Sequence, residues 1–248
     1  MGIAQLVCAI LPLFSVAQNH LKLTSISSNI GIQRSQYVIK TATSSEITGP
    51  PVVLYPRTFG VVLEDSLYEL QLVYKNQNFW QASPKWNEFE VISYAQSGRY
   101  FEHALEGFFS RKLIHSNRLQ LLAGLGVSLN FVPANRDDEN DVPTDSLFRG
   151  SIIQFDSDSN IRHEMQYYGR FVTSFYGTLN GRLMANYRAS KRLTFTVAAI
   201  YRQGFFAMFK SDFWYVNYLT GETGSGQMIN RGTAYGIELG LRYNIRKF

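Results

Sequence analysis

The chain has 248 residues and a formal net charge of +5, with only 17% charged residues and 15% aromatic residues. Soluble domains carry about 25% charged residues, and disordered chains are rich in charge and poor in aromatics, so a largely disordered chain is excluded. A bundle of membrane helices is also excluded. The longest uncharged apolar run, Ile3 to Ala17, spans 15 residues, whereas a membrane-spanning helix needs about 20. The small positive excess does not point to nucleic acid, and no nucleic-acid partner is expected.

The apolar run at the N-terminus is typical of a secretory signal peptide. Ser15 and Ala17 are small residues at the two positions that a signal peptidase reads. Pro12 disfavours the alternative, a buried N-terminal helix. We therefore expect a signal peptide over 1–17 and one mature domain over 18–248.

The rest of the chain alternates between apolar and polar residues with the period of two that indicates strands. In chain order, the expected strands lie near 20–33, 54–63, 67–79, 98–114, 118–132, 168–188, 191–211 and 232–247. The first two alternate least regularly, and Pro56 lies inside the second. Eight strands are expected, with ten as the alternative if 34–52 or 87–97 adds a hairpin.

The strand near 118–132 shows the pattern most clearly. Its odd positions, from Leu119 to Phe131, are all apolar, and its even positions are small or polar with the exception of Leu122. The polar faces of the strands are rich in Gly, Ser, Thr and Asn. Such faces make a poor water-exposed surface and are more typical of a narrow, packed interior, so the apolar faces are expected to meet lipid.

The connections between the strands alternate in length. Tight polar turns are expected at 64–66, 115–117 and 189–191, and long connections near 34–52, 80–87, 132–166 and 212–232. Short turns at one end and long connections at the other predict an all-β fold, a transmembrane antiparallel up-and-down β-barrel. The connection 132–166 is acidic and the turns are basic, so we expect the first outside the cell and the second in the periplasm.

These strands, the signal peptide and the final segment Tyr235–Phe248 together resemble the small bacterial outer-membrane β-barrels, in a style similar to those of Bacteroidetes-type bacteria. The terminal aromatic Phe248 resembles the assembly signal of that family. The resemblance implies location in the outer membrane of a Gram-negative cell envelope. It also implies outer-membrane lipid and lipopolysaccharide as partners, with another envelope protein as a further candidate.

Strand parity places a group of charged residues on the inner faces. An eight-stranded barrel has room only for side chains to fill its interior, and charges in so confined a space must pair or be hydrogen-bonded. We therefore predict an interior network of charges formed by Glu69, Glu102, Glu106, Glu238, Lys75, Lys112, Arg182, Arg202 and Arg242.

Other motifs give weaker signals. The segment Asp156–Asn160 resembles the start of a calcium loop, but Ile161 and Tyr167 stand where Gly and Glu are needed. Residues 221–226 are rich in glycine but lack the lysine of a phosphate loop, which favours a flexible loop tip. The aromatics at 213–215, like those around Trp80 and Trp86, suit either a sugar or protein partner or a membrane-interface belt.

No catalytic, metal-binding or cofactor-binding residues are expected. Cys8 is the only cysteine and would leave with the signal, and the four histidines lack metal-ligand spacing on one strand face. We expect a structural, adhesive or envelope-complex accessory role that acts through the extracellular loops, and no enzyme activity. Two alternatives stay open: a lipid-modifying enzyme at the rim, which would use His163 near Ser159 and Glu164, and a small diffusion pore.

Overall fold

The computed structural model describes residues 21–41, 47–48, 52–80, 99–132, 148–155 and 161–245. The expected signal peptide, Cys8, the segment Asp156–Asn160 and Phe248 lie outside these ranges. Across the described ranges, no helix is long and apolar enough to cross a membrane.

The described chain is all β. In order, the strands are β1 (Lys22–Thr41), β2 (Ile47–Thr48), β3 (Val52–Glu64), β4 (Tyr68–Trp80), β5 (Arg99–His115), β6 (Leu119–Phe131), β7 (Phe148–Phe155), β8 (Ile161–Phe171), β9 (Phe175–Arg188), β10 (Leu193–Gly204), β11 (Phe209–Asn217) and β12 (Glu222–Asn244).

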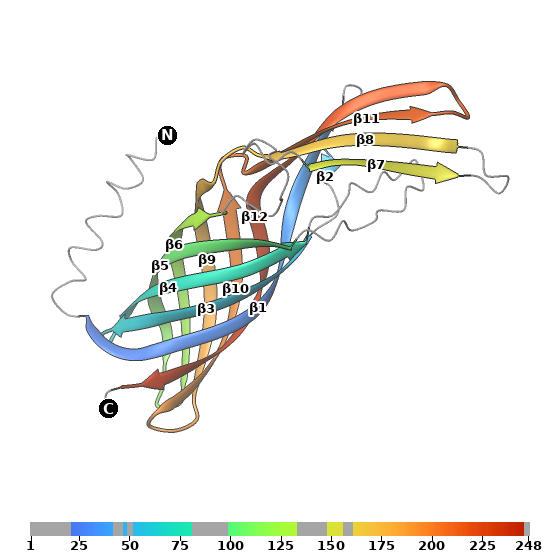
Figure 1. The fold of residues 1–248 in the computed structure, drawn as a ribbon. Coiled ribbons are helices and arrows are strands. Elements are labelled where there is room, and N and C mark those ends of the chain that lie inside the picture. The colour runs from blue at the N-terminus through green and yellow to red at the C-terminus, as the bar shows by residue number, and fades with distance from the viewer. Residues whose placement is uncertain are drawn as a thin grey trace.

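Eight of these strands close into an antiparallel barrel. Their order is β1-β3-β4-β5-β6-β9-β10-β12, and β12 pairs back onto β1 from Ser25 opposite Asn244 to Ser35 opposite Ala234. Figure 1 shows this cylinder in the lower part of the molecule. The prediction of eight barrel strands is confirmed.

The tight turns lie together at one end of the barrel. The β3–β4, β5–β6 and β9–β10 connections occur there, as the sequence predicts, and the described chain also starts and ends there. In the first turn, Asp65 Oδ1 accepts hydrogen bonds from the backbone N–H groups of Leu67 and Tyr68, both at 2.7 Å. Such side-chain acceptors fix the turn because they satisfy backbone donors that the strand ladder leaves free.

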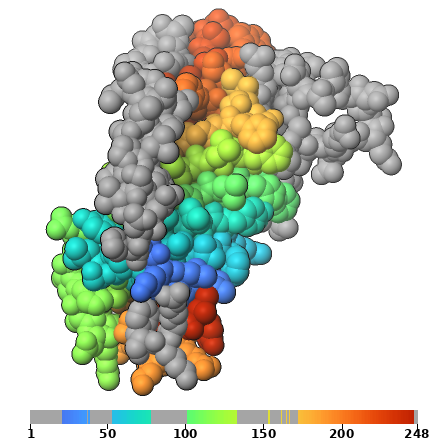
Figure 2. All heavy atoms as spheres, turned by 90° about the vertical axis from the view of Figure 1, so that its left-hand side faces the viewer, coloured from blue at the N-terminus to red at the C-terminus, as the bar shows by residue number. Residues whose placement is uncertain are grey.

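The other end of the barrel corrects the sequence prediction. The regions expected as loops at 34–52, 132–166 and 212–232 carry strands. The outer part of β1, the first half of β12, β11, β8 and β7 form a sheet that projects beyond the closed ring, with β2 paired to β1. We call this part the projecting sheet. Figure 1 shows it extending away from the barrel, and Figure 2 shows its orange-red tip at the opposite end from the red end of β12.

Most of the projecting sheet continues barrel strands, and β7 is added at its edge. The expected strand at 168–188 is divided into β8 and β9, and the expected strand at 191–211 is divided near Gly204, with β11 following. At both breaks the backbone stays connected, since Val172 N–H donates to Met208 O and Met208 N–H donates to Asn230 O, each at 2.8 Å. The breaks therefore bend a continuous sheet out of the barrel wall.

Candidate functional site

The outer wall of the barrel is apolar. Leu125 is 66% exposed, and the other large outward side chains of the wall follow the alternation expected from the sequence. The tight-turn end carries exposed aromatics such as Tyr187 and Tyr243, and the opposite end carries exposed aromatics such as Tyr55 and Tyr235. An exposed apolar wall with aromatic girdles at both ends is stable only against lipid.

The inner wall holds all nine charged side chains that parity assigned to it. Each is buried, with exposed fractions of 9% or less. Around Glu69, Arg242 donates two hydrogen bonds to the carboxylate, at 2.6 and 2.9 Å, and Arg182 lies 3.5 Å from it. The Arg182 guanidinium also lies over the ring of Phe108, 4.2 Å from its centroid.

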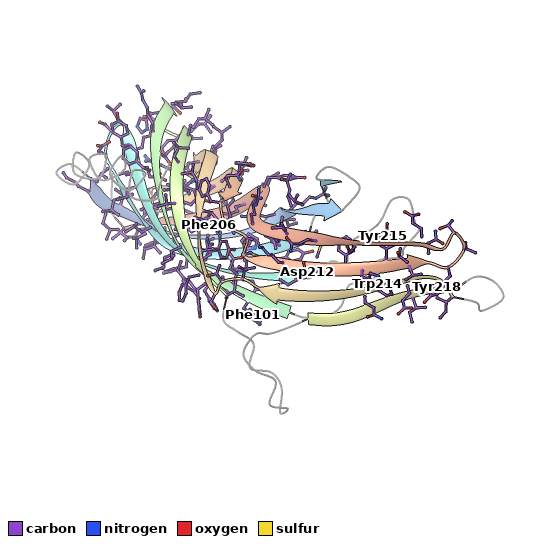
Figure 3. All side chains as sticks on the ribbon, turned by 90° about the horizontal axis from the view of Figure 1, so that it is seen from above. Phe101, Phe206, Asp212, Trp214, Tyr215 and Tyr218 are labelled. Carbon is purple, nitrogen blue, oxygen red and sulfur yellow. The ribbon has the colours of Figure 1, made fainter. Side chains whose placement is uncertain are left out.

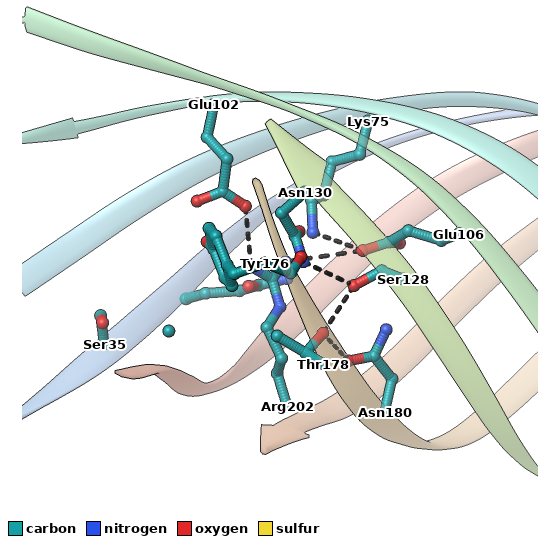
Figure 4. Close-up of polar contacts among 12 residues, drawn as sticks. Ser35, Lys75, Glu102, Glu106, Ser128, Asn130, Tyr176, Thr178, Asn180 and Arg202 are labelled. Carbon is teal, nitrogen blue, oxygen red and sulfur yellow. Dashed lines mark hydrogen bonds and ion pairs between the residues drawn. The ribbon is translucent and has the colours of Figure 1, made fainter. Parts of the chain in front are cut away.

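A second cluster joins β4, β5 and β10. Arg202 lies 3.1 Å from Glu102 and 3.6 Å from Glu106, and Lys75 forms an ion pair with Glu106. Figure 4 shows these side chains converging inside the barrel, beside a chain of hydrogen bonds that includes Asn130. Alternation along each strand points these side chains inward. They come together because inward positions on opposite walls face one another across a narrow interior.

The remaining two predicted charges have partners that sequence reasoning missed. Lys112 pairs with Glu64 at 2.7 Å and donates to Asp65 O at 2.6 Å, at the tight-turn end. Glu238 accepts a hydrogen bond from Gln33 Nε2 at 3.0 Å. Gln33 lies in the strand whose alternation is weakest, so only the pairing of β1 with β12 identifies it as a neighbour.

The exception to the apolar alternation of β6 also has an explanation. Leu122 points inward and is fully buried, where it packs in an apolar cluster with Met184, Ala198 and Ile200. Leu122, Met184 and Ala198 are paired in register across β6, β9 and β10. Ala198 is in turn opposite Glu238 on β12. The interior is therefore filled by both charged and apolar side chains.

The projecting sheet carries a different kind of surface. Alternation along β11 buries Phe209 and Phe213 on one face and leaves Asp212 and Trp214 exposed on the other. Figure 3 shows Asp212, Trp214 and Tyr218 along the projecting sheet, away from the barrel. Trp214 therefore lies outside the girdles of the barrel wall.

Polar side chains from the neighbouring strands complete this surface. Register places Gln166 of β8 beside Trp214, and Gln227 of β12 donates to Asp212 at 2.7 Å. Glu164 accepts hydrogen bonds from Gln166 and from Tyr218 Oη, both at 2.9 Å. We call Glu164, Gln166, Asp212, Trp214 and Gln227 the exposed sheet face.

The hydrogen bonds at Glu164 set its ionisation. Those from Gln166 and Tyr218 hold the pKa of the Glu164 carboxyl below its ordinary value, and the same carboxylate raises the pKa of the Tyr218 hydroxyl. Both groups belong to the part of the sheet beyond the barrel. At neutral pH the exposed sheet face is thus anionic at Glu164, whose carboxylate is hydrogen-bonded within β8 and to the turn after β11.

The weaker sequence motifs have mixed outcomes. Residues 218–221 form a turn and β12 begins at Glu222, so most of the glycine-rich stretch is strand rather than a flexible tip. His103 lies on the barrel wall, where its Nδ1 is 2.6 Å from Tyr74 Oη. The side chain of His163 lies outside the described part. Within the residues that the structure describes, no three His, Cys, Asp or Glu side chains gather as a metal-binding group.

Comparisons with known proteins give structural matches only. No family model and no curated protein sequence matches the chain. Neisserial surface protein A is similar over 90% of this chain and 97% of its own, with a TM-score of 0.43 and 8% identity. A major outer membrane protein from Thermus thermophilus covers 89% and 99%, with a TM-score of 0.42 and 11% identity. The attachment invasion locus protein Ail of Yersinia pestis covers 90% and 100%, with a TM-score of 0.35 and 9% identity.

The architecture itself decides the class of protein. An even number of antiparallel strands in a closed ring, tight turns at one end, an apolar outer band and aromatic girdles are the properties of bacterial outer-membrane barrels. This protein is an outer-membrane β-barrel. Closure matters because lipid offers no partner for an unpaired backbone N–H or C=O group. A closed ring of strands has no edge, so it leaves no such group unpaired.

Proposed function

We propose that the barrel serves as a rigid anchor for the projecting sheet, and that the exposed sheet face binds a partner outside the cell. The observation that carries this proposal is the position of Trp214, exposed on a strand that extends beyond the membrane-facing wall. An exposed tryptophan combines a large apolar ring with an N–H donor, which suits it to contacts with sugars and proteins. The role is thus adhesive, or accessory to an envelope complex.

The chemistry beside Trp214 supports the same proposal. Asp212, Gln227, Gln166 and Glu164 present carboxylate and amide groups already fixed by hydrogen bonds to one another. Groups held in place before binding lose less conformational entropy when a partner arrives. A polar ligand that stacks on an aromatic ring, such as a surface glycan or a polar protein loop, fits this arrangement.

The test uses cells of a non-adherent Gram-negative host that display the full chain. Their adhesion to immobilised glycans and envelope glycoproteins is compared with that of Trp214→Ala and Asp212→Ala cells. We expect a loss of about tenfold or more for Trp214→Ala, which corresponds to about 1.4 kcal/mol and is in the range of interface hot spots.

Tyr243→Leu is the matched control, because this exposed aromatic lies at the tight-turn end. It should adhere like the unmodified chain. Each variant is first checked for a heat-dependent shift of mobility in SDS gels, which reports the closed barrel. Equal adhesion of the unmodified chain, Trp214→Ala and vector-only cells would refute the proposal.

A further inference from the structure

A hollow lies on the outer wall of the barrel, across β1, β3 and β12. Its volume is about 790 Å³, within the range of about 300–1,000 Å³ typical of ligand sites. Its apolar surface comes from Ile30 and Ile32 of β1 and from Ile237 and Leu239 of β12, all of which are exposed. Because these residues belong to the apolar belt of the barrel, the hollow opens toward the hydrocarbon of the membrane.

Two arginines border the same hollow. Arg34 and Arg57 are both exposed and both line it, together with Tyr55 and Tyr235. Arg34 is opposite Tyr235 in the β1–β12 register, and Arg57 is two residues from Tyr55 on β3. Tyrosines on the outer wall mark the level of the membrane interface, so both arginines are placed at the head-group level.

The outward residues beside Arg57 on the next two strands are polar as well. Arg57 is opposite Asn76 of β4, which is opposite His103 of β5, and the three residues form a polar line on an otherwise apolar wall. Asn76 Nδ2 lies 3.3 Å from His103 Nδ1. Polar outward residues are tolerated where the hydrocarbon ends and are costly at its centre. These polar residues therefore favour a place toward the end of the hydrocarbon rather than at its centre, on the side of the barrel away from the tight turns.

Neither arginine has a protein counter-charge among the described residues. The ion pairs found there all lie inside the barrel or at its tight-turn end, and none involves Arg34 or Arg57. Two guanidinium groups without a protein counter-charge, beside an apolar hollow, suit an anionic partner that also carries hydrocarbon. Guanidinium groups bind phosphate through paired N–H donors.

We propose that this hollow binds a phosphate-bearing lipid of the outer leaflet. Its acyl chain lies along Ile30, Ile32, Ile237 and Leu239, and Arg34 and Arg57 hold its phosphate groups. The two arginines are four residues apart in register, since Arg57 is opposite Ile30, or roughly 13 Å along the sheet. A head group with two phosphates spans such a distance better than a single phosphate.

The experiment measures lipid that stays with the purified barrel. The full chain is extracted from Gram-negative outer membranes, washed extensively in mild detergent, and assayed for organic phosphorus per barrel and by native mass spectrometry. We expect one retained phosphorylated lipid for the unmodified chain, and at least about a tenfold loss for the double variant Arg34→Gln/Arg57→Gln. Ile237→Trp, which fills the hollow and keeps both charges, should also lose the lipid.

Two control variants change similar residues outside the hollow. Arg111→Gln removes an exposed arginine of β5 next to the tight turns, and Leu129→Trp enlarges an exposed side chain on β6. Both should retain lipid like the unmodified chain. The heat-dependent mobility shift of each variant shows separately whether the barrel is closed. The Arg34→Gln/Arg57→Gln variant should adhere like the unmodified chain, because adhesion is assigned to the exposed sheet face and not to this hollow.

Three results would overturn the proposal. One is equal phosphorus in the unmodified chain and the arginine double variant. Another is the same loss in Arg111→Gln. The third is equal retention of lipids that carry no phosphate, which would show an ordinary annulus of hydrocarbon around the barrel.

Discussion

Arg202 shows how a single residue depends on its setting inside the barrel. Its side chain is 2% exposed and contacts two carboxylates, those of Glu102 and Glu106. Removal of one member of a buried ion pair leaves the other charge without compensation, which costs far more than loss of the whole pair. Glu106 retains Lys75 in that case, whereas Glu102 has Arg202 as its ion-pair partner among the described residues.

We predict that Arg202→Met lowers the free energy of unfolding by about 3–5 kcal/mol. Arg202→Met combined with Glu102→Gln should be less destabilised than Arg202→Met alone, because the second change removes the orphaned charge. The measurement is reversible urea unfolding of the barrel in lipid vesicles. Additive losses from the two substitutions would contradict a direct coupling between these residues.

A substitution at Leu125 tests the outer, lipid-facing side of the barrel wall. It is exposed on β6, and its neighbour Gly124 faces inward, where an added Cβ would collide with Ser110 Oγ and lie 2.8 Å from Phe109 O. Leu125→Arg should cost about 2–4 kcal/mol if it lies near the middle of the bilayer. The same unfolding assay, with Leu125→Met as the control, measures this cost. Assembly and stability equal to those of the control would place Leu125 away from lipid.

At the scale of elements, the bend of β12 between the barrel and the projecting sheet lies at Gly232. Its φ of 76° belongs to the left-handed region, and an added Cβ would lie 2.6 Å from the ring of Tyr176. The register with β1 shifts at this position, where Ser35 is opposite Ala234 but Tyr37 is opposite Asn230. Gly232 thus allows one strand to leave the barrel and continue into the projecting sheet.

Gly232→Ala should destabilise the protein by about 1–3 kcal/mol, the usual cost of a strained backbone position. Gly181→Ala is the matched control, since Gly181 lies in a regular strand with no atom within 4 Å of an added Cβ. Hydrogen exchange of the amides in β11 and the first half of β12 reports the effect locally. Equal exchange in both variants would show that the bend does not depend on Gly232.

The pairing of β8 with the turn after β11 should respond to pH. Because the pKa of Glu164 is lower in the folded sheet than its ordinary value, the ionised carboxylate stabilises the sheet at neutral pH, and this contribution is lost as pH falls through the folded pKa. Tyr218→Phe removes one of the hydrogen bonds, so the pKa of Glu164 should rise toward its ordinary value. A carboxyl carbon NMR titration measures this. Tyr201→Phe, whose hydroxyl bonds to Gln203 instead, should leave the titration unchanged.

The elements show which features sequence could predict. Alternation identified the inner and outer faces because a strand with one face in lipid and the other in a packed interior must keep its period throughout. The same period continues beyond the membrane in β8 and β11, so alternation alone did not reveal where the barrel ends and the projecting sheet begins. Leu122 and Gln33 were also beyond its reach, because their roles depend on which strands meet across the interior.

At the scale of the whole molecule, the filled interior and the projecting sheet have different roles in the proposed function. The eight-stranded ring is filled by its own charges and by the cluster around Leu122, and the proposed function places the binding chemistry outside it. A diffusion pore needs a wider ring, typically of 16 strands or more. The same side chains that stabilise the ring therefore oppose ion flow through it.

We predict that the purified barrel shows no steady conductance in a planar bilayer. The Glu69 cluster, with Arg242 and Arg182, lies in the interior, and its hydrogen bonds would have to break for hydrated ions to pass. Replacement of Arg242 and Glu69 together by Ala should shorten both side chains and remove the carboxylate that Arg182 also contacts, and should raise the frequency of brief openings. Stable open-channel current from the unmodified chain would contradict the filled interior, since a bidentate ion pair at 2.6 and 2.9 Å leaves no room for a hydrated ion between the two residues.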